Sequence, residues 1–146
     1  MYKENKDITL QYYNQNAGSF VSSTIHADLT DTQNRFLSRL EPGAEILDFG
    51  CGSGRDTKYF LEHGYQVDAI DGSEELCKIA STYTGIPVRQ MYFQDLDVLE
   101  RYDGIWACSS ILHLEKTELK SVLQKMADAL RPGGWLYTSF KYGEFE

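Results

Sequence analysis

Short apolar runs alternate along the chain with segments whose apolar residues recur at helical spacing. The runs are typical of buried strands and occupy residues 45–49, 66–71, 88–93, 102–108 and 135–140. Between most of them the pattern predicts helices at residues 55–63, 73–83 and 117–130. Strands that alternate with helices favour a parallel sheet with right-handed crossovers. We therefore expect an α/β fold built on a doubly wound parallel sheet.

Two further helical patterns precede the first strand, at residues 9–16 and 31–40. A length of 146 residues fits one domain, and no repeat or low-complexity linker divides it. We expect residues 1–43 to form N-terminal cap helices and residues 44–146 to form the core. Ligands of doubly wound sheets bind at the carboxyl ends of the strands where the strand order reverses, and the cap is free to cover that place.

A glycine-rich turn joins the first strand to the helix after it. The sequence D-F-G-C-G-S-G begins at Asp48 and has alternate glycines at Gly50, Gly52 and Gly54. Such a turn is free of Cβ clashes, and the next helix offers unpaired N–H groups, so a ligand can approach closely. Asp48 suits the ammonium group of an amino-acid moiety. Asp71 ends the second apolar run and is placed to accept ribose hydroxyls.

The spacing of these glycines argues against a dinucleotide cofactor. The dinucleotide fingerprint is G-x-G-x-x-G, and Arg55 stands where its third glycine belongs. An NAD-dependent oxidoreductase is therefore disfavoured.

These residues resemble the class I S-adenosylmethionine-dependent methyltransferases, and within them the small-molecule group that includes the tellurite-resistance type enzymes. Features of the family occur in order: the glycine turn, acids at positions 71, 95 and 103, and P-G-G before the fifth strand. The resemblance runs from about residue 12 to the last residue. It implies a Rossmann-like sheet of order 3-2-1-4-5. It also implies transfer of a methyl group from S-adenosylmethionine to a small-molecule acceptor, with S-adenosylhomocysteine as product.

Members of this family usually continue past the fifth strand with a helix and two more strands, numbered 6 and 7. This sequence closes with K-Y-G-E-F-E, so we expect strands 6 and 7 to be missing. The fifth strand, W-L-Y-T-S-F, would then be an apolar edge of the kind that pairs with another chain, which predicts self-association. A non-catalytic or truncated S-adenosylmethionine-binding module stays open as the alternative function.

The resemblance implies a site made mostly of binding residues, because the sulfonium already makes the methyl group electrophilic and the enzyme supplies position. It assigns Asp48 to the methionine ammonium, Asp71 to the ribose and Asp95 to the adenine amine. Residues 72 and 73 would flank the adenine, residue 96 would offer its N–H to the ring, and residues 108 and 109 would supply carbonyls near the ammonium. The implied cofactor-binding set is Asp48, Gly50, Cys51, Gly52, Gly54, Asp71, Gly72, Ser73, Asp95, Leu96, Cys108 and Ser109.

Two residues are candidates for a catalytic role. His113 follows the fourth strand, where the family places substrate-facing residues, and an imidazole can act as a general base near neutral pH. A role in positioning the substrate is favoured over one as a base, and the alternative to both is a histidine packed at the join of a loop and a helix. Tyr13 belongs to the N-terminal segment and could contact the sulfonium through its ring. Its alternative is an aromatic residue packed on the sheet.

Composition limits the partners of the chain. The net charge is −8, and the sequence contains no cluster of lysine and arginine. Nucleic acid is therefore disfavoured as a partner, because a phosphate backbone would be repelled. No signal peptide is recognisable, and no apolar stretch approaches the roughly 20 residues that span a membrane. Three cysteines without a C-x-x-C pair favour a reducing cytoplasm and no metal site.

Overall fold

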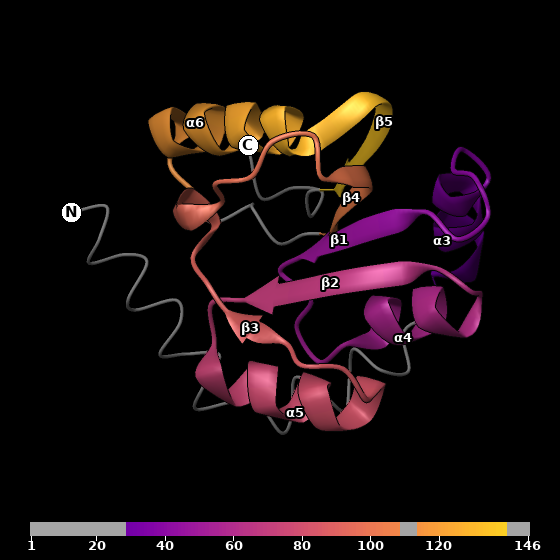
Figure 1. Cartoon of the computed structure of the whole chain (residues 1–146). Helices are drawn as coiled ribbons and strands as arrows, with labels where there is room; N and C mark the ends of the chain where they lie inside the picture. Colours follow the sequence, from indigo (N-terminus) through magenta and orange to yellow (C-terminus); the bar gives the residue numbers. More distant parts are fainter. Residues whose placement is uncertain (1–28, 109–113, 140–146) are drawn as a thin grey trace.

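The computed structural model describes residues 29–108 and 114–139 (Figure 1). The strands are β1 (Glu45–Phe49), β2 (Gln66–Asp71), β3 (Arg89–Gln90), β4 (Tyr102–Cys108) and β5 (Leu130–Ser139). The helices are α3 (Thr30–Leu37), α4 (Arg55–Glu62), α5 (Glu74–Thr84) and α6 (Lys116–Ala129), with a 3-10 turn, η1 (Phe93–Asp95). The helix predicted at residues 9–16 lies outside the described residues.

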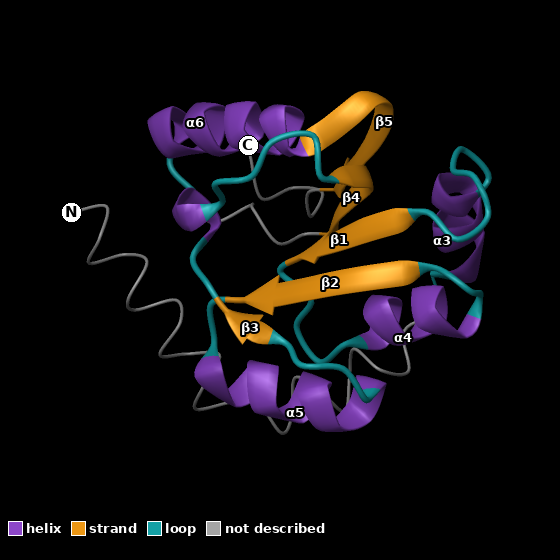
Figure 2. Ribbon diagram, viewed as in Figure 1, coloured by secondary structure: helices purple, strands orange, loops and turns teal. Residues whose placement is uncertain are grey.

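The strands form a parallel sheet in the order β3-β2-β1-β4-β5. The α/β fold class and the strand order predicted from the sequence are therefore confirmed. Helices α4 and α5 lie on one side of the sheet and α6 on the other (Figure 2). The order reverses between β1 and β4, and this is the place where such sheets bind ligands.

Two predicted strands were wrong in their extent. The run at residues 88–93 forms only the short β3, because the chain leaves the sheet and turns into η1, where the Phe93 ring packs 4.6 Å from that of Phe49. β5 begins at Leu130, directly after α6, and so includes the P-G-G sequence expected as a turn before it. The register of β5 against β4 is irregular there, and Gly133 has a φ of 81°. A strand edge with such an irregularity accommodates proline, which cannot donate to the ladder.

A side-chain cap fixes the start of α5. Ser73 precedes the helix, and its hydroxyl accepts the Leu76 N–H at 3.2 Å. Glu74 and Glu75 place acids in the first turn, where they complement the helix dipole. This cap also fixes the chain directly after the carboxyl end of β2.

Apolar clusters bury both faces of the sheet. On one face, Val122 and Met126 of α6 are buried against residues of β1 and β4. On the other face Phe36 of α3 and Phe60 of α4 surround Trp106 of β4, with each ring centroid 5.3 Å from that of the tryptophan. Gly104 of β4 makes room for α3, because a Cβ there would lie 2.7 Å from the Phe36 ring. The close packing of α3 on the sheet therefore depends on a glycine at position 104.

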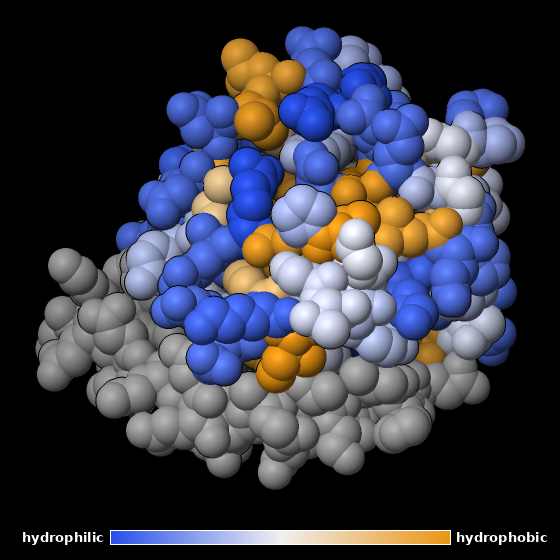
Figure 3. Space-filling view, turned by 60° about the horizontal axis from the view of Figure 1, so that its bottom comes forward, coloured by the Kyte–Doolittle hydropathy of each residue, from blue (hydrophilic) through white to orange (hydrophobic). Residues whose placement is uncertain are grey.

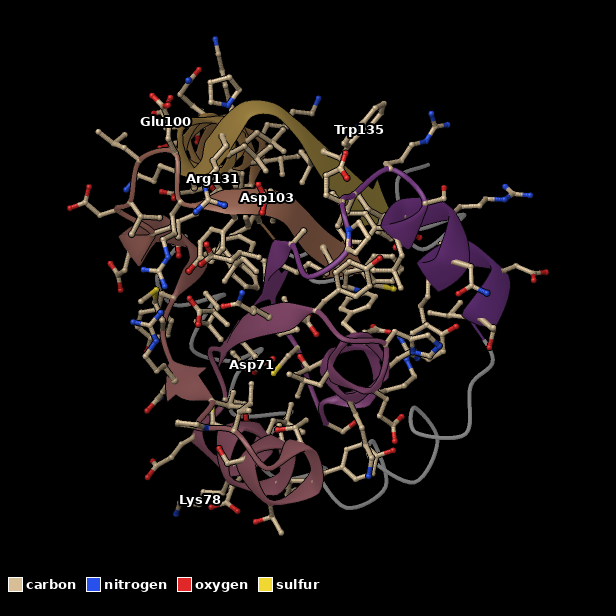
Figure 4. All side chains as sticks on the ribbon, turned by 45° about the vertical axis from the view of Figure 1, so that its right-hand side comes forward. Asp71, Lys78, Glu100, Asp103, Arg131 and Trp135 are labelled. Atoms are coloured by element: carbon tan, nitrogen blue, oxygen red, sulfur yellow. The ribbon has the colours of Figure 1, made fainter. Side chains whose placement is uncertain are left out.

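Ion pairs join the amino ends of four strands. Arg131 contacts Glu45 at 2.7 Å and Asp103 at 3.0 Å (Figure 4). Arg101 lies 3.6 Å from Glu45 and 3.2 Å from Asp68. Asp103 also accepts the backbone N–H of Glu45 at 2.8 Å. All five side chains are partly exposed, so each pair contributes modestly to stability.

Hydrophilic residues predominate on the face in Figure 3, with apolar residues gathered in a band across it. Within the described chain, the large hydrophobic residues that are exposed are Leu99 and Trp135, and the Arg39 guanidinium lies over the Trp135 ring at 4.9 Å. The helices that the structure describes include none with the length and apolar character needed to cross a membrane.

Candidate functional site

The glycine turn lies at the carboxyl end of β1 and is hydrogen-bonded to β2. The backbone N–H groups of Gly50 and of the next residue donate to the Ile70 carbonyl at 3.0 and 2.9 Å. Gly50, Gly52 and Gly54 have φ values of 88°, 56° and 94°, a region that favours glycine. At Gly54 a Cβ would also lie 2.7 Å from the Thr84 methyl group. The result is a bare backbone cradle.

Asp71, at the end of β2, holds this turn in place. Its Oδ2 accepts the Gly52 N–H at 2.9 Å and its Oδ1 accepts the Ser73 N–H at 2.9 Å. Burial raises the pKa of Asp71, while these two N–H groups lower it. Figure 4 shows Asp71 well apart from the Arg131–Asp103 pair. Each carboxylate oxygen has a second lone pair, so both can still accept a hydrogen bond from a ligand hydroxyl.

Asp48 lies beneath the turn and is 1% exposed. Its Oδ2 accepts the Thr57 hydroxyl at 2.6 Å. Burial raises the pKa of Asp48 well above its ordinary value, and the nearby carboxylate of Asp56 raises it further. A ligand on the turn would therefore meet Asp48 through the intervening backbone.

Asp56, in the first turn of α4, collects hydrogen bonds from three elements. Gln33 of α3 donates to it at 2.6 Å and Trp106 of β4 at 2.9 Å. Arg55 donates through Nε at 3.1 Å and through Nη2 at 2.9 Å. Asp56, Gln33 and Trp106 are all buried. This arrangement was not predicted from the sequence; the signal that could have suggested it is an acid on the buried face of a helix, which requires donors.

The Arg55 guanidinium reaches the carboxyl end of β4. Its Nη2 lies 3.9 Å from the Cys108 sulfur, and the Ser139 hydroxyl lies 3.6 Å from the same sulfur. Burial raises the pKa of the Cys108 thiol, so this group is neutral near pH 7. Arg55 thus places a basic group between the glycine turn and β4.

The residues expected to meet adenine follow β3. Asp95 is exposed at the end of η1, and Leu96 after it is buried. The Leu96 N–H faces the Phe93 carbonyl at 3.3 Å, a long hydrogen bond that a ligand could replace. The carbonyl of Gly72 accepts from the Gln90 side chain at 3.2 Å.

The structure brings most of the predicted cofactor set to one edge of the sheet. Gathered at the carboxyl ends of β1, β2 and β4 are Asp48, Gly50, Cys51, Gly52, Gly54, Asp71, Gly72, Ser73 and Cys108. Cys51 is buried against Cys77 and Ala80, which raises the pKa of its thiol. Ser109, His113 and Tyr13 lie outside the described residues.

Other features of the surface do not extend this site. A hollow of about 410 Å³ runs along α6, lined in the described chain by Lys116, Leu119, Lys120, Leu123, Gln124 and Ala127. It includes none of the residues around the glycine turn. Over residues 29–108 and 114–139, no three histidine, cysteine or acidic side chains are grouped so as to hold a metal ion.

Known proteins share both the sequence pattern and the fold. Residues 46–134 match the sequence model of a family described as a methyltransferase domain. A ubiquinone biosynthesis O-methyltransferase from Xanthomonas axonopodis pv. citri is 34% identical over 124 residues, which cover 79% of this chain and 51% of that protein. The chain spans about half or less of the length of the first curated relatives that it matches.

Solved structures of methyltransferases have a similar fold. A 1,6-didemethyltoxoflavin-N1-methyltransferase from Burkholderia thailandensis, solved with 1,6-didemethyltoxoflavin and S-adenosylhomocysteine bound, superposes with a TM-score of 0.77 at 25% identity. The match covers 93% of this chain and 63% of that one. A TehB-like SAM-dependent methyltransferase from Corynebacterium glutamicum gives a TM-score of 0.72 at 22% identity, over 94% of this chain and 76% of that one, and supports the fold.

Proposed function

Because this chain belongs to the methyltransferase domain family, we propose that it binds S-adenosylmethionine and transfers the methyl group to a small-molecule acceptor. The observation that carries the proposal is the bare glycine turn fastened to Asp71 by the Gly52 N–H. A ligand can lie directly on this backbone and still reach both Asp71 oxygens. The S-adenosylhomocysteine bound to the Burkholderia neighbour supports the same cofactor class.

The residues present fit the cofactor. The positive φ angles of the glycines keep side chains out of the cradle, and Asp71 is held ready to accept the ribose hydroxyls. Asp95 and the Leu96 N–H would meet the adenine. The backbone at Cys108 and Ser109 would face the ammonium. The cofactor supplies an electrophilic methyl group, so the task of the chain is to hold and orient an acceptor toward it.

The acceptor class is inferred from named relatives and from charge. One relative is an O-methyltransferase of ubiquinone biosynthesis and one structural neighbour is an N1-methyltransferase of a small heterocycle. A net charge of −8 disfavours nucleic acid as the acceptor. Residues 1–43 are proposed to cap the site; α3, the described helix of this segment, packs beside α4 on one face of the sheet. A reducing cytoplasm suits the three free cysteines.

A second candidate function is cofactor binding without turnover. It uses the same cofactor-binding residues as the first candidate, at the carboxyl ends of β1, β2 and β4. Only turnover separates the two candidates, since both predict binding of the cofactor.

Self-association through β5 is a further part of the proposal. Among the described strands, β5 pairs on one side only, with β4, and Trp135 on it is 45% exposed. An edge of this kind can pair with a second copy. Sedimentation over a wide concentration range tests it: a rise in mass with concentration is expected, and a monomer throughout would exclude it.

Calorimetry tests the central proposal. The full chain is titrated with S-adenosylmethionine, with S-adenosylhomocysteine and, as a control, with NAD. Binding of the first two and not of NAD is expected, since the glycine spacing does not fit a dinucleotide. A chain that binds neither adenosyl ligand would contradict the proposal. Turnover in a screen of small oxygen, nitrogen, sulfur and metalloid acceptors then separates the enzyme from the binding module.

A further inference from the structure

We propose that one flank of α6 is a contact surface for a second copy of this chain, whose own α6 lies antiparallel along it. This surface is separate from the cofactor site and from the edge of β5, and it does not depend on the proposed function. The hollow of about 410 Å³ lies on it. In the described chain this α6 flank consists of Lys116, Leu119, Lys120, Leu123, Gln124 and Ala127.

The α6 flank lies on the side of the helix that is turned away from η1. Val122 and Met126 face the sheet and are fully buried. Successive residues of a helix are about 100° apart, so Lys125 and Leu123 lie on opposite sides of Val122. The Lys125 ammonium donates to the Gln94 carbonyl in η1. The side that carries Leu123 is therefore free of η1.

The α6 flank is apolar along its middle and polar at its rim. Leu119 and Leu123 are half-buried, whereas Lys116, Lys120 and Ala127 are exposed. Residues four apart lie on one face of a helix, so the two leucines form a ridge. Ridges of this kind interdigitate when two helices pack at about 8 to 10 Å. A second helix would thus remove the remaining apolar surface of both leucines from water.

The charges of α6 select an antiparallel partner helix. Lys116 opens the helix, and Asp128 lies in its last turn beside Ala127. A two-fold axis across the middle of the flank brings the first turn of each helix against the last turn of the other, so Lys116 meets the partner's Asp128 at both ends. A parallel pair would instead bring lysine against lysine.

The Asp128 carboxylate is placed to accept such a contact. It is exposed, and its Oδ1 accepts the Gln124 amide at 3.0 Å. A carboxylate has about four lone-pair sites, so Asp128 can accept a lysine ammonium as well. The pair would lie at the rim of the contact, where charges contribute to specificity more than to affinity.

The dimer should be weak. From Lys116 to Ala127 the flank is about 16 Å long, which is small for a protein interface. The net charge of −8 on each copy adds a general repulsion. Association is therefore expected only at high protein concentration, with dimer and monomer in rapid exchange.

Sedimentation equilibrium of the full chain over a wide concentration range tests the proposal. The unmodified chain should form a dimer. Ala127→Lys should raise the dissociation constant roughly tenfold or more, because the new cation faces the partner's Lys116. Lys116→Glu alone and Asp128→Lys alone should each raise it severalfold, since each sets like charges together. The double variant restores opposite charges and should recover most of the affinity.

The charge reversals also control for folding. An acid in the first turn and a base in the last turn both suit the helix dipole, so neither reversal should weaken α6. Circular dichroism and thermal unfolding check this. Lys78→Glu changes the net charge as Lys116→Glu does, but on exposed α5, across the sheet. Figure 4 shows Lys78 well apart from Trp135 of β5, and this variant should dimerise like the unmodified chain.

A chain that is monomeric at every concentration would overturn the inference and leave the hollow to another partner. A dimer that Ala127→Lys and both single reversals leave unchanged would overturn it too, and would assign association to another surface such as β5. A double variant weaker than either single one would exclude the antiparallel arrangement. Binding of S-adenosylmethionine is measured separately, so failure of the proposed function would leave this result unaffected.

Discussion

The two ends of the sheet use charge in opposite ways. At the amino ends of the strands, acids and arginines pair in partly exposed positions, as Arg131 does with Glu45 and Asp103. At the carboxyl ends, Asp48, Asp56 and Asp71 are buried, and each accepts at least one hydrogen bond from within the protein. Exposed pairs gain little and cost little, whereas buried carboxylates are costly unless every oxygen is satisfied. The difference indicates that the amino end fastens strands, while the carboxyl end keeps an ordered polar site.

The first way to break this contrast is to remove one acid at each end. Asp56→Ala leaves buried donors on Gln33 and Trp106 unpaired and should lower the free energy of unfolding by about 3 to 5 kcal/mol. Asp103→Ala, at the amino end, should cost about 1 kcal/mol or less. Urea unfolding measures both. Similar losses for the two variants would contradict the contrast.

A pair of glycines gives the next largest effect. Gly54→Ala places a Cβ 2.7 Å from the Thr84 methyl group and forces alanine to a φ of 94°, which should cost about 3 kcal/mol. Gly64 precedes β2 at the opposite end, with a φ of 89° and nothing near its Cβ, so Gly64→Ala should cost about 1 kcal/mol. Thermal unfolding compares them. If Gly64→Ala were the more damaging, crowding in the glycine turn would not matter.

Ligand binding sharpens the comparison further. Asp71→Ala removes both acceptors for the ribose hydroxyls and should weaken S-adenosylmethionine binding by about 1 to 3 kcal/mol. Asp103→Ala removes an acid of the same size from the amino end and should leave affinity unchanged. Calorimetry at one pH decides, and an unchanged affinity of Asp71→Ala would remove this residue from the site.

The smallest effect concerns pH. The folded-state pKa of Asp48 is raised by burial, so its contribution to stability is fully present below its unfolded pKa and is lost as pH rises through the folded pKa. Asp48→Asn cannot titrate and can still accept from Thr57. As the pH rises from roughly 4 to 8, the unmodified chain should lose stability relative to Asp48→Asn. The difference between their free energies of unfolding should change by about 1 kcal/mol or more in favour of the variant. Asp103→Asn is the matched control. A gap that stays constant with pH would contradict burial of a titrating acid at position 48.

Local patterns explain what the sequence could predict. β1, β2 and β4 have the predicted bounds because each is an apolar run closed by turn residues, and Ser73 caps α5 through a contact three residues away. The length of β3 and the start of β5 depend on packing and pairing partners that no local pattern contains. The same holds for Asp56: its partners Gln33 and Trp106 lie 23 and 50 residues away in the chain.

In the site, too, the features set by local sequence were predicted and those set by distant partners were not. The glycine turn was predicted because a motif of adjacent residues carries it, and Asp71 because it ends the next apolar run; the structure joins them by the Gly52 N–H. Arg55 was noticed only as a residue that excludes a dinucleotide. Its place beside Cys108, 53 residues further along, emerges once β1 and β4 are neighbours.

Gly104 has a consequence for how sequences of this kind can change. Its missing side chain lets the Phe36 ring, and with it α3, lie against β4. α3 carries Gln33, which holds Asp56, which in turn holds Arg55. A larger residue at position 104 would push α3 outward and loosen a guanidinium that it does not touch. Natural variation at this remote position would then be restricted by the hydrogen bonds of the buried Asp56, and compensating changes would be expected first in the residues of α3.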